Sequence, residues 1–292
     1  QKPYVPLENL HKLLCRFCSF ELFRCEGASV RPMPTPYWSE LSELWICHGE
    51  NQVLKRWPTG KITALPKHFL IADTTVLVHP GDFGSKTLDW ALVDTPLSHV
   101  PVVCTRCKSP VGVAEPHPNT SFADSLGNTL DSFSGVMFNR HSVRTDEDLS
   151  RDDFREDTLE TALSSDILAA SDQLSRQRFA FCDSLTHRPR VLVNVFSWNA
   201  SVAAGGGNGG KAQQVLKVQY LDCLGDSESS SRLLESWGGL SATELMPRPE
   251  EECDSMMTIL RHSTLCMPPA QRKLGTTWLG FLKKPQAWNE DR

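Results

Sequence analysis

Short apolar runs separated by polar turns dominate the first half of the chain. Two apolar stretches within 13–25 flank a turn and predict a hairpin. The run 68–79 is rich in β-branched residues and ends before Pro-Gly, which is typical of a strand or a tight hairpin. Further strands are predicted at 100–104, resuming at 111–113, and, from a weaker alternation, at 133–143.

The second half of the chain holds the stronger strand patterns. Apolar and β-branched residues fill 178–182 and 190–198, and the turn at 186–189 joins them as a hairpin. The segment 215–220 alternates like a half-buried strand, and 276–282 predicts a closing strand.

Helical spacing of apolar residues occurs in few places. It predicts amphipathic helices at 37–45, 158–178 and 250–262, the last of which is stopped by Pro268-Pro269. The glycine-rich stretch 205–210 lacks the lysine and the strand-to-helix context of a phosphate-binding loop, so we expect a flexible connection there.

These patterns together predict a strand-dominated α+β protein with two packed halves. We place a β region that carries cysteine knuckles at 1–118 and a C-terminal α+β region at 119–292, packed as one body.

Charge and hydropathy argue against two classes of protein, nucleic-acid binders and membrane-spanning proteins. The 292 residues contain 30 Lys and Arg against 35 Asp and Glu, for a net charge of −5. This balance argues against a dedicated nucleic-acid binder, which needs an excess of cations for phosphate contacts. No apolar run is long enough to span a membrane, and the first residues do not resemble a signal peptide.

Two Cys-x-x-Cys doublets provide the clearest candidate chemistry. Cys15 and Cys18 form the first, and Cys104 and Cys107 form the second. Two thiolates on one tight turn can share a tetrahedral ion, and two such turns complete a four-cysteine site for structural zinc. We expect the neighbouring cations Arg16, Arg106 and Lys108 to lower the thiol pKa values, and backbone N–H groups to donate to the sulfurs.

The long gap between the doublets leaves alternatives open. About 85 residues separate them, whereas ordinary zinc ribbons have ~15–20. A shared zinc would therefore clip distant strands together; separate free cysteines and thioredoxin-like redox chemistry are the other two interpretations. Doublets at this spacing in a chain of this size favour a location inside the cell.

Other cysteines and charges have two interpretations each. Cys47 and His48 form a second-site or supporting ligand pair, with Cys25 as a partner, or they are a buried thiol and a hydrogen-bonded imidazole. The acidic segment 145–155 is a solvated loop or a docking site for a basic partner. The four single cysteines are expected to be small core residues, with a nucleophile as the alternative: Cys182, Cys223, Cys253 and Cys266.

No sequence motif of small-molecule catalysis is present. The chain lacks a G-x-S-x-G elbow, an H-E-x-x-H pair and a Walker A loop, and its nine histidines are scattered. A cysteine that accepts an acyl group leaves little trace in a sequence, so the catalytic residues stay unknown.

The order of several motifs resembles the HECT-like ubiquitin-conjugating-enzyme-binding family, a group of proposed ubiquitin-protein ligases. The matching features run from residue 13 to 283: the two cysteine doublets, Trp38 to Trp45 leading to Cys47-His48, Leu70 to His79, Gly112, Val215 to Tyr220 with Cys223, and Pro268 to Leu282. The segment from Ser263 to Pro268 departs from the acceptor-cysteine pattern of HECT ligases.

The resemblance implies a ubiquitin-conjugating enzyme as partner and ubiquitin-ligase-like action through protein contacts. Fungal members of the family are associated with messenger-RNA cleavage and polyadenylation, which implies a non-catalytic alternative: binding and stabilising the 3′-end-processing endonuclease. The resemblance thus implies a protein of the nucleus and cytoplasm.

Overall fold

The computed structural model describes residues 10–33, 62–83, 87–90, 100–116, 133–203, 212–223, 232 and 234–285. The chain divides into two compact units, residues 1–158 and 159–292. The predicted helix at 37–45, the Cys47-His48 pair and the glycine-rich stretch lie outside the described residues.

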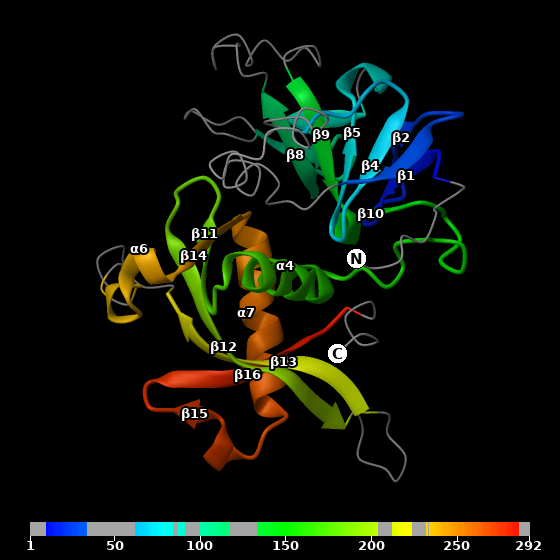
Figure 1. Cartoon of the computed structure of the whole chain (residues 1–292). Coiled ribbons are helices and arrows are strands. Elements are labelled where there is room, and N and C mark those ends of the chain that lie inside the picture. The colour runs from blue at the N-terminus through cyan, green and yellow to red at the C-terminus, as the bar shows by residue number, and fades with distance from the viewer. Residues whose placement is uncertain are drawn as a thin grey trace, which may run out of the picture. The chain divides into compact units, whose positions relative to one another are not determined.

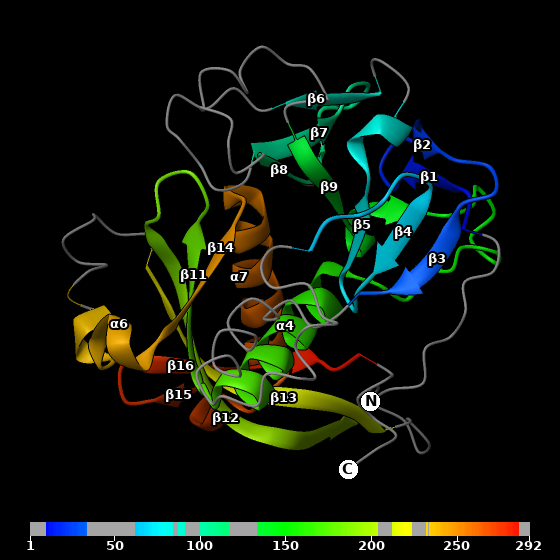
Figure 2. The same ribbon diagram turned by 45° about the horizontal axis from the view of Figure 1, so that its top comes forward.

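A seven-stranded sheet forms most of the N-terminal unit. Its order is β3-β4-β5-β9-β8-β7-β6, which can be followed in Figure 2, and all its pairings are antiparallel except β3 with β4. The strands are β3 (Ser29–Pro32), β4 (His68–Ile71), β5 (Thr75–Val78), β6 (Leu88–Trp90), β7 (Val100–Cys104), β8 (Pro110–Pro116) and β9 (Phe133–Asn139). The predicted strands of the first half are therefore confirmed.

A second, three-stranded sheet completes the N-terminal unit. Its order is β10-β1-β2, formed by β10 (Val143–Arg144), β1 (Lys12–Cys15) and β2 (Glu21–Arg24), so the predicted N-terminal hairpin is confirmed. Short 3₁₀ turns occur at Pro80–Asp82 and Arg140–Ser142. The two sheets share one apolar core that includes Leu13, Phe69 and Phe138.

The compact units divide after Thr158, not after residue 118. The reason is strand pairing: β9 pairs with β5 and β8, and β10 pairs with β1, so the segment that follows residue 118 belongs to the N-terminal sheets. Sequence patterns report that a strand exists but not which strands it will pair with.

The C-terminal unit is a six-stranded mixed sheet with two long helices. Figure 1 shows the sheet order β14-β11-β12-β13-β16-β15, in which only β11 and β14 run parallel. The elements are α4 (Leu159–Leu174), β11 (Arg178–Asp183), β12 (Pro189–Ala203), β13 (Ala212–Asp222), α6 (Gly239–Ala242), β14 (Glu244–Arg248), α7 (Glu250–Leu265), a 3₁₀ turn (Pro269–Gln271), β15 (Lys273–Leu274) and β16 (Thr277–Lys283). The strand-dominated α+β class is confirmed.

The outer side of β16 is closed without a full neighbouring strand. The Phe281 N–H donates to Ser263 Oγ on α7 over 2.8 Å, and the Lys283 N–H donates to Glu160 Oε1 on α4 over 2.8 Å. Side chains of both helices thus occupy backbone donors that could otherwise template the pairing of another chain.

Candidate metal centre

The first cysteine doublet lies on the tight turn between β1 and β2. The Cys15 N–H donates to the Phe20 carbonyl over 2.8 Å, and the Ser19 N–H donates to the Cys15 carbonyl over 2.9 Å. Ser19 has φ 61°, a left-handed conformation that a non-glycine residue adopts at some cost. This turn brings Cys18 back to the side of Cys15.

The second doublet repeats this turn between β7 and β8. The Cys104 N–H donates to the Ser109 carbonyl over 2.9 Å, and the Lys108 N–H donates to the Cys104 carbonyl over 2.8 Å. Lys108 has φ 61°. The two knuckles therefore share a backbone conformation, although their sequences agree only at the cysteines.

A third turn of the same kind occurs in the C-terminal unit without cysteines. The Asp183 N–H donates to the Arg188 carbonyl over 2.9 Å, the His187 N–H donates to the Asp183 carbonyl over 2.8 Å, and His187 has φ 55°. Asp183 and Thr186 stand at the cysteine positions, and their side chains hydrogen-bond to each other over 2.5 Å. The backbone of a knuckle is thus a general hairpin turn, and the thiols are what makes the two knuckles candidates for binding a metal.

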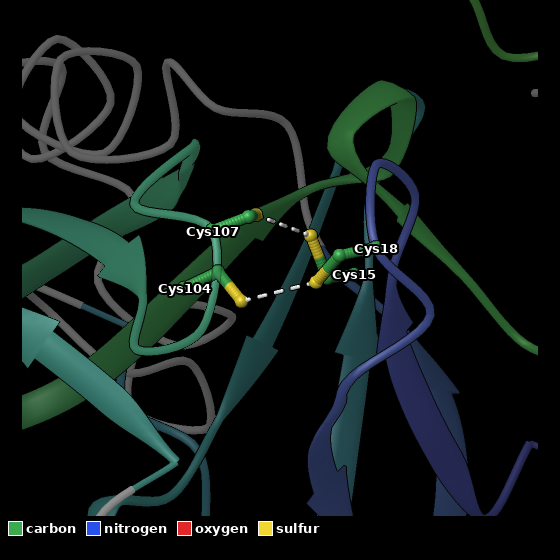
Figure 3. A group of neighbouring side chains, drawn as sticks. All are labelled: Cys15, Cys18, Cys104 and Cys107. Carbon is green, nitrogen blue, oxygen red and sulfur yellow. Dashed lines mark hydrogen bonds between the residues drawn. The ribbon is translucent and has the colours of Figure 1, made fainter.

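The four thiols of the two knuckles meet in one cluster, shown in Figure 3. The Sγ atoms all lie within 4.8 Å of one another. Cys15 Sγ is 3.6 Å from Cys107 Sγ, and Cys18 Sγ is 3.6 Å from Cys104 Sγ. Four sulfurs at ~2.3 Å from a tetrahedral zinc would be about 3.8 Å apart, whereas a disulfide needs ~2.05 Å.

Burial has the largest effect on the pKa values of the first thiol of each knuckle, Cys15 and Cys104, here called the inner thiols. It raises the pKa of Cys15 and of Cys104, which are both fully buried. Backbone N–H groups oppose this effect: those of Cys18 and Phe17 act on Cys15, and those of Cys107 and Arg106 act on Cys104. The expected N–H donors to sulfur are confirmed, in the same arrangement at both knuckles.

Cys107 differs from the inner thiols. Burial raises its pKa, but the hydrogen bonds of Ser109 and of the neighbouring thiols outweigh burial and bring the pKa to about 6. Cys107 Sγ lies 3.3 Å from Ser109 Oγ. Ser109 is a site residue that the doublet spacing did not reveal.

The expectation that nearby cations lower the thiol pKa values is wrong for Cys15 and Cys104. Arg16 is turned away from the sulfurs: its Nη2 donates to the carbonyls of Val143 over 2.9 Å and of Phe154 over 2.7 Å. It also lies 3.5 Å from the Oδ2 atom of Asp152. Arg16 therefore ties the first knuckle to the segment after β10.

Asp152 holds that segment from within. Its side chain is fully buried, and its Oδ1 accepts hydrogen bonds from the N–H groups of Thr145 and Phe154, both over 3.0 Å. Arg140 stacks on the Phe154 ring at 4.7 Å. The acidic segment 145–155 is thus an ordered loop without helix or strand, anchored by a buried carboxylate.

The cluster fits a metal ion by its chemistry. Binding requires thiolates, and several thiolates this close together need a positive charge among them. Arg16 does not supply that charge, because its guanidinium is held by backbone carbonyls and Asp152. Among the described residues this is the only group of three or more candidate ligands placed for one ion.

The remaining described cysteines lie apart from the cluster. Cys25 packs at the edge of the N-terminal core, half-buried. Three of the four single cysteines are buried as expected: Cys182, Cys223 and Cys253. Cys266 is exposed, so the expectation of a core residue is wrong there; it is the C-cap residue of α7, directly after the last helical residue.

Membrane insertion by a helix finds no support in the described part of the chain. None of its helices combines the length and the apolar character that a membrane crossing needs.

Comparisons with known proteins place the chain in the ubiquitin system. The chain is similar to a protein of Mus musculus named as an E3 ubiquitin-protein ligase, with 22% identity over 295 residues, covering 91% of this chain and 71% of the mouse protein. No solved structure matches it. The sequence model of HECT-like ubiquitin-conjugating enzyme (E2)-binding proteins matches residues 4–279. The chain therefore belongs to the HECT-like ubiquitin-conjugating enzyme (E2)-binding family.

Proposed function

We propose that this protein is a zinc-stapled, ubiquitin-ligase-like protein that binds a ubiquitin-conjugating enzyme. Two findings together carry the proposal: the family match over residues 4–279, and the four-thiol cluster that two knuckles within that region form. In this proposal Cys15, Cys18, Cys104 and Cys107 hold one zinc ion. Its role is structural, because four thiolate ligands leave no open position for a substrate.

Zinc bound here would cross-link strands that are far apart in sequence. Cys18 and Cys104 are 86 positions apart. By the loop-closure relation for a cross-link, fixing a loop of that length stabilises the folded state by about 4.6 kcal/mol. The proposed metal thus secures the junction between the two sheets of the N-terminal unit, from β1 in one to β7 in the other.

Metal analysis of the purified chain tests the zinc assignment. We expect about one zinc per chain in the wild type, loss of zinc in Cys104→Ser, and unchanged zinc in Cys25→Ser. Cys25 is the matched control, since it is a half-buried cysteine of the same unit outside the cluster. Stoichiometric zinc in Cys104→Ser would contradict the assignment.

The ubiquitin-ligase-like action is tested with charged conjugating enzymes. Incubation with E2-ubiquitin thioesters should show binding and faster discharge of ubiquitin to lysine. A thioester relay would require an accessible thiol: its sulfur would attack the thioester carbonyl and release the E2 thiol. Cys266 is the exposed candidate among the described cysteines, so a reducible ubiquitin adduct lost in Cys266→Ser identifies the relay.

The burial of Cys182, Cys223 and Cys253 favours the non-catalytic version, in which the chain acts only by binding. Under that version discharge survives Cys266→Ser. The narrower alternative, that the partner held is the endonuclease of messenger-RNA 3′-end processing, predicts that this nuclease co-purifies stably with the chain from nuclear extract. Residence in nucleus and cytoplasm is part of the same proposal, and imaging of the tagged full protein tests it.

A further inference from the structure

Phe17 stands exposed at the end of the first knuckle. It is 65% exposed, more than any other large apolar residue in the described part of the chain. Cys15 and Cys18 flank it within the thiol cluster, and Arg16 is anchored inward on backbone carbonyls. The ring is therefore carried on a backbone that is fixed on both sides, and a fixed, exposed aromatic ring is a typical anchor of protein interfaces.

Two guanidinium groups are attached to the same turn. Arg106, from the second knuckle, donates through Nη1 to the Cys18 carbonyl over 3.4 Å, and Arg144, from β10, donates to Ser19 Oγ. Within the described residues no carboxylate lies at ion-pair distance from either group. The turn that presents Phe17 is thus flanked by two cations with unused capacity for carboxylates.

Two further cations of the described residues near the turn are already paired with carboxylates. The nearby cations Lys108 and Lys12 are paired with Asp89 at 2.8 Å and with Asp146 at 4.0 Å. A nucleic-acid path needs a track of free cations and several stacking rings, whereas a protein interface needs a central aromatic or arginine anchor with charges at its rim. The arrangement favours a polypeptide partner.

We infer that Phe17, Arg106 and Arg144, together called the knuckle tip, form the docking surface for the ubiquitin-conjugating enzyme. The inference rests on the proposed function and adds the surface that performs it. The inference requires a complementary face on the enzyme, with an apolar pocket for the ring and carboxylates at its rim for the guanidinium groups. Because the thiol cluster and the Arg16 anchor hold the tip in place, little conformational freedom is lost on binding.

Biolayer interferometry with the full chain and a panel of purified conjugating enzymes tests the inference. Phe17→Ala and Arg106→Glu should each weaken binding of the cognate enzyme roughly tenfold or more, the effect expected of an interface anchor. Leu149→Ala and Arg31→Glu are matched controls, because both positions are exposed in the same unit. Zinc content and thermal unfolding of all four variants should equal those of the wild type.

The outcomes separate the inference from the proposed function. Binding by the wild type that survives both tip substitutions overturns the docking surface and leaves the proposed function standing. Failure of the wild type to bind any conjugating enzyme overturns the proposed function itself. A labelled single-stranded oligoribonucleotide serves as the third arm: saturable binding lost only in the tip variants, with enzyme binding unchanged, assigns the tip to nucleic acid and overturns the inference.

Discussion

Replacing Asp152 by alanine should destabilise the N-terminal unit far more than expected for a carboxylate in an acidic, solvated loop. The substitution removes the acceptor of two backbone N–H groups, at Thr145 and Phe154, and of the Thr145 hydroxyl. It also leaves the Arg16 guanidinium, 24% exposed, without its carboxylate. Removing one partner of a buried ion pair costs about 3–5 kcal/mol, and the partial exposure of Arg16 places the expectation near the lower end, about 3 kcal/mol.

The matched control is Asp148→Ala in the same loop. Asp148 also accepts the N–H of the residue two positions later, Ser150, over 2.9 Å, but its side chain is 56% exposed. Water replaces that hydrogen bond when the carboxylate is removed, so the loss of stability should be small. The pair of variants therefore compares a buried, multiply bonded carboxylate with an exposed one in the same loop.

Urea unfolding and limited trypsin digestion measure the effect. A loss of about 3 kcal/mol in the local opening free energy raises the opened population roughly 100-fold, so cleavage after Arg151 and Arg155 should accelerate by that factor in Asp152→Ala. Both arginines are exposed in the loop that Asp152 anchors. Equal midpoints and equal cleavage rates in Asp152→Ala and Asp148→Ala would refute the assignment of Asp152 as the anchor of this loop.

Three further predictions follow from burial and close packing. Iodoacetamide under native conditions should label Cys266 well before the buried thiols of the C-terminal unit. Quantitative mass spectrometry measures the extent of labelling at each cysteine. Equal labelling of all these cysteines contradicts the burial pattern. Burial raises the pKa of those thiols to about 11 for Cys182 and Cys223 and about 12 for Cys253. Between pH 9 and 11 the unfolded chain loses these protons and the folded chain keeps them. The free energy of unfolding should therefore fall as the pH rises, by about 1.4 kcal/mol per pH unit for each thiol. Urea titrations at several pH values measure this fall. Finally, Gly112→Ala should destabilise the protein much more than Gly135→Ala. A Cβ at position 112 would lie 2.1 Å from the Met137 carbonyl oxygen, which is backbone, whereas a Cβ at position 135 would lie 2.7 Å from the movable end of the Leu77 side chain. Similar thermal midpoints for the two variants would contradict this reasoning.

Several parts of the fold could be predicted from local patterns. The hairpins at 68–79 and 178–198 and the helices that became α4 and α7 follow from the period of apolar residues, which depends only on the local backbone geometry. The thiol spacing likewise indicated two knuckles, because a tight turn that brings two thiolates together needs a fixed number of residues.

The partners of these local elements could not be predicted in the same way. Arg16 was expected to act on the adjacent sulfurs, yet it contacts Asp152, a residue far along the chain. Phe154 reads as an isolated apolar residue in an acidic segment, but it is fully buried under Arg140. Cys253 and Cys266 were both expected in the core, yet Cys253, within α7, is buried and Cys266, at the end of α7, is exposed.

The sequence by itself determined the strand-dominated class and the turn at each doublet, since each depends on residues that are neighbours in the chain, and it carried the family resemblance through the order of its motifs. Only the tertiary structure decided that the two doublets form one cluster. The strand β10, which pairs with β1, follows β9, and β9 pairs with β8, which pairs with β7, so turns 86 positions apart meet. The tertiary structure also decided that Arg16 faces inward while Phe17 and Arg106 are exposed. Burial and exposure are set by long-range packing, which the order of residues does not state locally.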